Sequence, residues 1–485
     1  MSIRQSLAFS FLDRYASLVL AIGSSMVLAR LLTPTEMGLF SITMVLVSFA
    51  TMIRDLGAGQ YLVQERELTN DRIRAVWAVQ LGAGLCLGLL TALAAWPISR
   101  FYGEPRMQPI FWVLALGFVL TPFGSITYAW LTRTMRYDAM AVMRFASSLA
   151  GAIVSVGLAW YGAGPISMAW GSLAATCTGA LVSMRFRPRE FPWLPGTREL
   201  PRVLSFGSKL TSTSLVETAT AGAPELLLGK IQSITSAGLF ARANTLIAMF
   251  ARMVSDAVNI VALSMFAKAS REGGDLARAY LTANAYMLAV GWSFSAFVGC
   301  MAYPLMRVLY GDQWDAAVDL TRVLALWLAA TAPAALCYQV LLASGAANVL
   351  LRSVVISGVL TVAGAAIGAC HGILATGSLM AGAAAMGTVV WLTSTRGVIH
   401  FRWADYLDGL WRSAGVAGCA SLAPALLVLV VGPRPASGLL WILIAAAIGS
   451  GLGFLLGVRL LSHPISAEVD RAAAALRARL RRLPA

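Results

Sequence analysis

Residues 29–40 read ARLLTPTEMGLF, and residues 229–240 read GKIQSITSAGLF. Aligned without a gap, they place Arg30 opposite Lys230 and give each stretch the same Gly-Leu-Phe ending, at Gly38 and at Gly238. Such self-similarity at a fixed offset is the signature of an internal repeat. The chain is therefore expected to contain two copies of one structural unit.

A second pair of stretches supports this repeat, because it follows the first pair in the same order. Tyr102-Gly-Glu, then VLAL at 113–116 and Pro122, are echoed by Tyr310-Gly-Asp, VLAL at 323–326 and Pro333. Two ordered echoes are difficult to obtain by chance.

The composition indicates a membrane protein. Of the 485 residues, 58% are hydrophobic and only 12% are charged, and the mean hydropathy is +0.75. Soluble domains carry about 25% charged residues, so a water-soluble enzyme of this size is excluded. The long apolar runs are continuous and rich in Ala, Leu and Gly, without the alternation that a lipid-facing barrel needs, and this predicts helices.

Each helical span needs about 20 mostly apolar residues, and the runs of that length predict an all-α polytopic protein with about fourteen transmembrane helices. The expected spans lie near 8–32, 37–58, 74–97, 109–131, 140–161, 164–184, 206–229, 237–265, 280–309, 317–343, 350–370, 373–395, 411–431 and 437–460. No sizeable soluble domain fits between them.

The distribution of charge predicts that both termini are cytoplasmic. The formal net charge is +15, from 37 Lys and Arg against 22 Asp and Glu. With the N-terminus inside, most basic residues fall on inner loops or in the tail, as the positive-inside rule requires. The basic balance therefore needs no nucleic-acid partner. The residues expected on outer loops are Arg100, Arg106, Lys230, Arg307 and Arg434.

Six spans before the long polar connection give the second copy the same orientation as the first, so the repeats are parallel. The predicted domains are a six-helix lobe at 1–185, a cytoplasmic linker at 186–205, a second six-helix lobe at 206–400, two further spans at 401–461 and a basic tail at 462–485. Two such lobes around a cavity are typical of transport by alternating access.

The sequence contains few signals of a disulfide, a metal site or a cofactor. The six cysteines lie in apolar stretches without metal-ligand spacing, so neither a disulfide nor a metal site is expected. We expect no cofactor, because there is no nucleotide-binding loop. The start of the chain lacks a basic region with a cleavage site and is expected to be an uncleaved first span. The tail predicts a basic amphipathic helix on the inner leaflet, or alternatively a partner-binding helix.

Four stretches carry a family resemblance: LARLLTPTEMGLF at 28–40, RDLGAGQYLVQ at 54–64, LTRTMRY at 131–137 and YGDQW at 310–314. They resemble the polysaccharide transporter (PST) branch of the MOP flippase superfamily, in its O-antigen, exopolysaccharide and colanic-acid-type flippases. The resemblance implies a MATE-like fold in a bacterial inner membrane and a non-enzymatic flippase for undecaprenyl-pyrophosphate-linked oligosaccharide repeat units. Besides this lipid-linked oligosaccharide and membrane lipids, a polysaccharide polymerase and a chain-length regulator are expected partners.

Three alternatives stay open at this point. Two are other transporters of the same superfamily, a peptidoglycan-precursor flippase and a multidrug or cation antiporter, and the quoted stretches argue against both. The third is a polytopic glycosyltransferase or polymerase. The lack of a large external loop and of a paired-carboxylate signature disfavours it.

Charged residues inside the spans are the candidate site, because charge at mid-bilayer costs about 2.5–3.5 kcal/mol and should face water or a partner. We expect Arg14, Arg242 and Arg252 to bind the pyrophosphate through their guanidinium groups. Asp13, Glu217, Glu225 and Asp256 would compensate this charge or bind a coupling H⁺ or Na⁺. The alternative is a structural ion-pair network between two helices.

Candidate gate or hinge positions are Arg54, Asp55, Pro122, Pro224 and Pro333. Proline inside a span kinks or breaks the helix, which a rocking transporter can use. An ordinary packing kink, or a salt-bridged cytoplasmic turn at Arg54 and Asp55, is the alternative at each.

Overall fold

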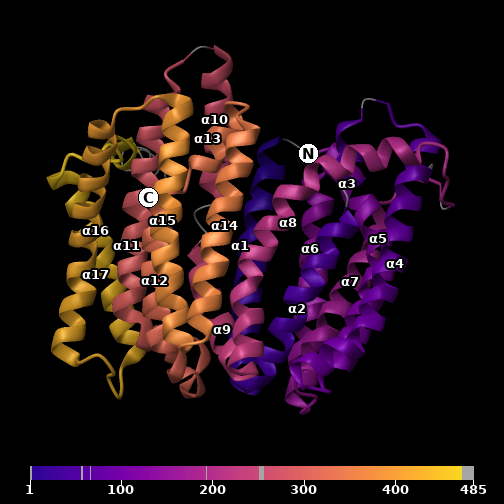
Figure 1. The fold of residues 1–485 in the computed structure, drawn as a ribbon, viewed down its shortest axis with the longest axis horizontal. Helices are drawn as coiled ribbons and strands as arrows, with labels where there is room; N and C mark the ends of the chain where they lie inside the picture. The colour runs from indigo at the N-terminus through magenta and orange to yellow at the C-terminus, as the bar shows by residue number, and fades with distance from the viewer. Residues whose placement is uncertain are drawn as a thin grey trace, which may run out of the picture. The chain divides into compact units, whose positions relative to one another are not determined.

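The computed structural model describes the backbone of residues 3–55, 58–65, 67–189, 191–192, 194–250, 256–272 and 274–471. Within these ranges, the side chains of 3–15, 53, 55, 58, 202, 204–214, 250, 256–257, 259–261 and 270 are not described. Within each of its two units, Figure 1 shows long helices that run roughly alongside one another, and the described residues contain no strand. The all-α prediction is confirmed.

The described ranges consist mainly of helices that follow one another along the sequence. They are α1 (Ile3–Leu31), α2 (Pro34–Asp55), α3 (Ala58–Gln64), α4 (Asn70–Tyr102), α5 (Met107–Arg133), α6 (Tyr137–Trp160), α7 (Ile166–Phe186), α8 (Leu200–Ile231), α9 (Ile234–Phe250), α10 (Asp256–Glu272), α11 (Leu276–Tyr310), η2 (Asp312–Ala317), α12 (Val318–Thr331), η3 (Ala332–Ala334), α13 (Cys337–Ala343), α14 (Ala347–Ala369), α15 (Ile373–Ile399), α16 (Trp403–Val431) and α17 (Leu439–Leu460). Of the described helices, eleven are long and apolar enough to cross a membrane.

The chain divides into two compact units, Met1–Gly238 and Leu239–Ala485. In the first unit, α5 packs on α4 and α7, α6 packs on α1 and α7, and α2 packs on α8. In the second unit, α11 packs on α12, α16 and α17, while α15 packs on α12 and α14. Packing therefore assigns α8 to the first unit, whereas the repeat begins the second lobe at residue 206. The lobe boundaries drawn from the repeat stay a prediction.

The repeat is visible in how α2 and α9 begin. The Thr33 Oγ1 atom accepts a hydrogen bond from the backbone N–H of Glu36, and the Glu36 carboxylate accepts one from the N–H of Thr33. This reciprocal capping satisfies two N–H groups that a helix start leaves open. At the equivalent position, Ser233 Oγ accepts from the N–H of Ser236. Both copies thus start a helix with a hydroxyl cap before the shared glycine.

Two predicted spans differ from the observed helices. The span predicted at 317–343 is interrupted by the 3₁₀ turn η3 between α12 and α13, at Pro333. The span predicted at 237–265 corresponds to α9 and α10, with residues 251–255 outside the described ranges. The short helix α3 was not predicted, because its seven residues are too few for a periodic signal.

The predicted linker at 186–205 is attached to the first unit. Phe191 is buried in a core cluster with Tyr61 and Trp77, and its ring meets Trp130 edge-on at 5.1 Å between centroids. The N–H of Gly196 donates to the carbonyl of Arg74 at 3.0 Å. Phe191 and Gly196 therefore connect the described part of this segment to the first unit.

Candidate functional site

A cavity of about 140 Å³ lies inside the first unit, among α2, α5 and α7. This volume has room for several waters or for one small polar group. The lining residues are Met44, Val47, Thr51, Arg54, Val113, Leu114, Gly117, Phe118, Thr121, Ser172, Leu173 and Thr176. The cavity thus combines an apolar wall with one cation and four hydroxyl groups.

The charge in this cavity is Arg54, at the end of α2. Its guanidinium carbon lies 5.8 Å from the centre of the Phe118 ring, within the range of a cation–π contact. A guanidinium offers five N–H donors in a fixed plane and matches phosphate oxygens well. The cavity wall therefore suits an anionic group.

The threonines of the cavity add hydrogen-bond acceptors. The hydroxyls of Thr51, Thr121 and Thr176 each donate to the carbonyl four residues earlier in the same helix, at 3.0, 2.7 and 3.0 Å. A hydroxyl that has donated its proton keeps lone pairs for a further donor. These oxygens suit the hydroxyl groups of a sugar or water.

Several predicted site residues fall outside this description. Arg252 lies outside the described ranges, and so do the side chains of Asp13, Arg14, Asp55 and Asp256. Of the three arginines predicted to bind the pyrophosphate, only Arg242 has a described side chain.

Arg242 is buried in the second unit, with 5% of its surface exposed. Its guanidinium carbon lies 4.6 Å from the ring centre of Tyr310 and 5.2 Å from that of Trp314. Both rings are almost fully buried. The structure thus gives Arg242 a packing contact with the YGDQW stretch, and its predicted role in substrate binding stays a prediction.

The two predicted carboxylates on α8 occupy different environments. Glu225 is 8% exposed and accepts a hydrogen bond from Ser41 Oγ of α2, whereas Glu217 is exposed. Sequence reasoning missed Ser41, since a single serine in an apolar helix carries no pattern. Only the packing of α2 against α8 reveals it.

The three predicted hinge prolines are all buried. Pro122 lies inside α5 and Pro224 inside α8, and neither helix is interrupted there. At Pro333 the helix does break, and the freed Pro333 carbonyl accepts hydrogen bonds from Asn284 Nδ2 at 3.1 Å and from Tyr406 Oη at 3.0 Å. A side-chain pair has replaced the missing helical hydrogen bonds.

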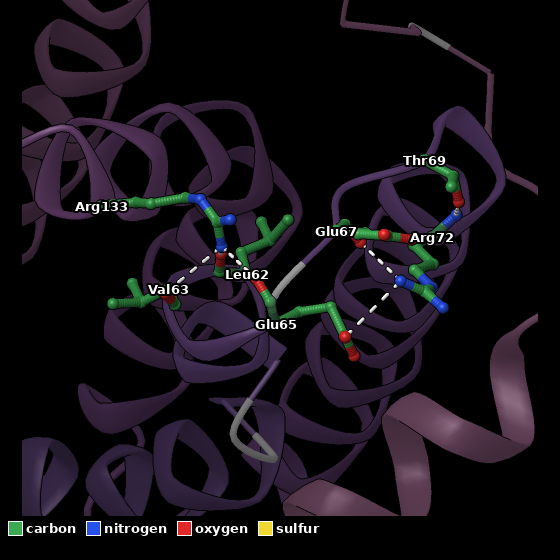
Figure 2. Close-up of polar contacts among 7 residues, drawn as sticks. All are labelled: Leu62, Val63, Glu65, Glu67, Thr69, Arg72 and Arg133. Atoms are coloured by element: carbon green, nitrogen blue, oxygen red, sulfur yellow. Dashed lines mark hydrogen bonds and ion pairs between the residues drawn. The ribbon is translucent and has the colours of Figure 1, made fainter.

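A polar cluster follows the Arg54 end of α2, and sequence reasoning did not single it out. Figure 2 shows the Arg133 guanidinium directed at the end of α3, where it donates to the carbonyls of Leu62 at 3.0 Å and Val63 at 3.4 Å, and also to that of Glu65. The last carbonyls of a helix lack internal partners, and a cation there is stabilising. Arg133 belongs to the LTRTMRY stretch, which was its only sequence signal.

The neighbouring residue of this cluster is Arg72, at the start of α4. Its guanidinium donates to the carbonyl of Glu67 at 2.5 Å and pairs with the Glu65 carboxylate at 3.5 Å, while Thr69 Oγ1 accepts from its backbone N–H (Figure 2). Arg133 and Arg72 thus both contact residues at the end of α3 and just after it.

Two further observations concern metal binding and the pKa of Arg187. Among the described residues, no three His, Cys, Asp or Glu side chains lie together as metal ligands. Just after α7, Arg187 lies 5.3 Å above the Trp77 ring, and burial lowers the pKa of its guanidinium.

Comparison with known proteins identifies the family. A family model described as "Polysaccharide biosynthesis protein" matches residues 27–319, which is more than half of the chain. The chain belongs to this family. It is a polysaccharide transporter of the MOP flippase type, as the quoted stretches predicted.

Curated relatives of this polysaccharide transporter agree with the assignment. It is 25% identical over 378 residues to the succinoglycan biosynthesis transport protein ExoT of Rhizobium meliloti, covering 76% of this chain and 75% of the relative. It is also 22% identical to the lipopolysaccharide biosynthesis protein WzxC of Escherichia coli, over 61% of each chain.

Solved structures show the same fold. The transporter matches the lipid II flippase MurJ in an inward closed conformation with a TM-score of 0.77 and 13% identity, over 95% of this chain and 98% of the other. An inward-facing multidrug resistance MATE transporter of the MOP superfamily gives a TM-score of 0.65 and 14% identity, over 79% and 94%. The MATE-like architecture is thereby confirmed.

Proposed function

We propose that this transporter moves an undecaprenyl-pyrophosphate-linked oligosaccharide from the inner to the outer leaflet of a bacterial inner membrane, by alternating access and with both termini in the cytoplasm. The observation that carries the proposal is the family match over residues 27–319. The relatives named for succinoglycan, lipopolysaccharide and teichuronic acid synthesis support a polysaccharide precursor as the cargo.

The chemistry of the cavity in the first unit supports a polar, anionic cargo. Arg54 supplies a charged planar donor, and the threonine hydroxyls supply acceptors. The cavity is too small for a whole repeat unit, so in this proposal it receives one polar group, while the polyprenyl chain stays in lipid. Binding of the pyrophosphate by Arg14, Arg242 and Arg252 is a separate part of the proposal.

The test is transport in vesicles that contain the purified full-length chain and a fluorescent undecaprenyl-pyrophosphate-linked oligosaccharide. Because Arg54 is proposed to bind the anionic group, Arg54→Ala should lower the initial rate of translocation at least tenfold. Arg54→Lys should restore part of this rate, since lysine keeps the positive charge but lacks the planar guanidinium group. Arg252→Ala should act in the same direction as Arg54→Ala.

A matched control is Arg106→Ala, because Arg106 is exposed on the connection between α4 and α5 and pairs with Glu104. Its rate should equal that of the unmodified protein. Equal rates for Arg54→Ala and Arg106→Ala, with both proteins folded, would remove Arg54 from the proposed site. Transport of a peptidoglycan precursor or of an organic cation in place of the oligosaccharide would favour the other members of the superfamily.

A further inference from the structure

The contact between α2 and α8 in the first unit is unusually close. On α8, Gly222 and Gly229 face α2: a Cβ atom on Gly222 would lie 2.3 Å from Val45 Cγ1, and one on Gly229 would lie 2.3 Å from Ile42 Cδ1. Glycines at a helix contact allow two backbones to approach, as is common in membranes. We call this contact the α2–α8 seam.

One carboxyl group is enclosed in the α2–α8 seam. Glu225 lies between the two glycines, three residues after Gly222 and four before Gly229, so all three share one face of α8. It is 8% exposed, and Ser41 Oγ donates to its Oε2 atom. A single neutral donor compensates poorly for burying a carboxylate, which is stable in a protein interior only when it is paired or neutral.

No cation among the described side chains forms an ion pair with Glu225. Two titratable groups on the packed elements contact other partners. From α4, Tyr102 donates to the Leu226 carbonyl at 3.3 Å. On α8 itself, Lys230 donates to the Phe101 carbonyl and stacks on the Phe101 ring at 4.1 Å.

The charged residues of α2 with described side chains lie at the two ends of that helix. Glu36 caps the first turn, and Arg54 lines the cavity at the last turn. Tyr61 is the titratable group of the short helix α3 and belongs to a core cluster. The Glu225 carboxyl is therefore enclosed by groups that are occupied with other partners or lie at helix ends.

At the start of α2, the seam ends where the two copies of the repeat contact one another. Thr35 Oγ1 and Thr235 Oγ1, which are equivalent in the two copies, share a hydrogen bond of 2.8 Å. A Cβ atom on Gly38 would lie 2.1 Å from the carbonyl oxygen of Ile234, and one on Gly238 would lie 1.9 Å from that of Pro34. The first turns of α2 and α9, up to Gly238, thus cross backbone against backbone, with matching residues in contact.

We propose that Glu225 is a proton-binding site that controls this seam: the neutral carboxyl allows α8 to close on α2, and loss of the proton separates the two helices. The proton comes from bulk water and returns to it, with no covalent change elsewhere. The inference rests on the proposed transport function, in which such a site would couple seam closure to a proton gradient. A metal cation fits less well, because it needs more oxygen ligands than Ser41 and Glu225 provide.

Closure of the seam can be measured without any cargo. In the full-length chain in vesicles, a Thr35→Cys/Thr235→Cys pair reports on the crossing, since the two side chains are in contact when the seam is closed. The rate of disulfide formation under a fixed oxidant is followed by mass spectrometry of the linked peptide at pH 5.5 and pH 8.5. Thiol chemistry itself depends on pH, so each rate is divided by that of the same pair with Glu225→Gln, which mimics the neutral carboxyl.

We expect this ratio to be close to one at pH 5.5 and at least fivefold lower at pH 8.5. Glu104→Gln, which neutralises a carboxyl on the connection between α4 and α5, should leave the fall of the ratio between pH 5.5 and pH 8.5 unchanged. A ratio that is the same at both pH values would overturn the proposal. Restoration of the ratio at pH 8.5 by sodium but not by potassium would overturn it in favour of a sodium site.

A second measurement uses the chain without the two introduced cysteines, in case the double-cysteine variant fails to fold. Hydrogen exchange of the peptide that covers residues 215–231, corrected for intrinsic exchange, should be about tenfold faster at pH 8.5 than at pH 5.5, and Glu225→Gln should abolish this difference. Equal protection at both pH values would overturn the proposal. Because neither readout involves a sugar lipid, a failed transport assay with a pH-dependent seam would contradict the proposed function alone.

Discussion

At the scale of single residues, the surroundings of a charge decide what it can do. Arg54 and Arg242 are both arginines within apolar helices, and sequence position alone does not separate them. Arg54 lines a cavity with hydroxyl groups, whereas Arg242 is buried against Tyr310 and Trp314. The cost of charge in lipid predicts that each has a partner, but only tertiary packing tells which partner it is.

His463, which follows α17, is a residue whose pH response can be predicted. Its Nδ1 atom accepts from the N–H of Ile465 at 3.2 Å, and its Nε2 atom lies 3.1 Å from Ser413 Oγ. These contacts suit the neutral ring, since protonation would remove the acceptor at Nδ1. Burial, and to a lesser extent the charge of Arg412, lowers the pKa of His463 to about 4.

The stabilising effect of His463 should therefore depend on pH. The unfolded chain takes up this proton near pH 6.5, while the folded chain resists it until about pH 4. The contribution is complete above pH 6.5 and is lost progressively as the pH falls toward 4. The melting temperature in detergent should fall across this range, and His463→Gln should flatten that fall. His400→Gln, at an exposed position, should not; an equal effect of the two variants would show that the prediction is wrong.

At the scale of elements, the break at Pro333 is stabilised by side chains from two other helices of the second unit. A broken helix leaves carbonyl groups without partners, and in an apolar environment each must find a donor. Asn284 of α11 and Tyr406 of α16 supply the donors. The sequence marked Pro333 as a candidate hinge, because proline cannot donate a helical hydrogen bond, but the same argument applies to Pro122 and Pro224, whose helices are not interrupted. It could not predict the donors, which lie far away along the chain.

Removing one of these donors should destabilise the second unit. Tyr406→Phe deletes only the hydroxyl, and we expect a loss of about 1 kcal/mol, the usual net value of one hydrogen bond. Asn284→Ala should cost somewhat more, because it also leaves a buried space. Thermal unfolding in detergent measures both. Tyr161→Phe removes a hydroxyl that is exposed to solvent and should leave the melting temperature unchanged. Unaltered melting of Tyr406→Phe would mean that the Pro333 carbonyl needs no such donor.

At the scale of the whole molecule, periodicity and repetition were sufficient for the fold class. The apolar runs predicted the helices. The aligned stretches that end at Gly38 and Gly238 predicted the repeat, and both copies begin a helix with a hydroxyl cap. Irregular features escaped prediction for a physical reason. The helix α3 and the Arg133 cluster depend on contacts between residues about 70 positions apart, and Ser41 is defined only by Glu225, on another helix.

The most direct test of the central claim is the movement of the lipid-linked sugar itself. Vesicles with the purified full-length chain are loaded with a fluorescent undecaprenyl-pyrophosphate-linked oligosaccharide in the inner leaflet, and a membrane-impermeant quencher outside reports its arrival in the outer leaflet. We expect quenching to rise with time only when the chain is present, and to slow with Arg54→Ala. Quenching at the same rate in empty vesicles and in vesicles that contain the chain would contradict a role in translocation.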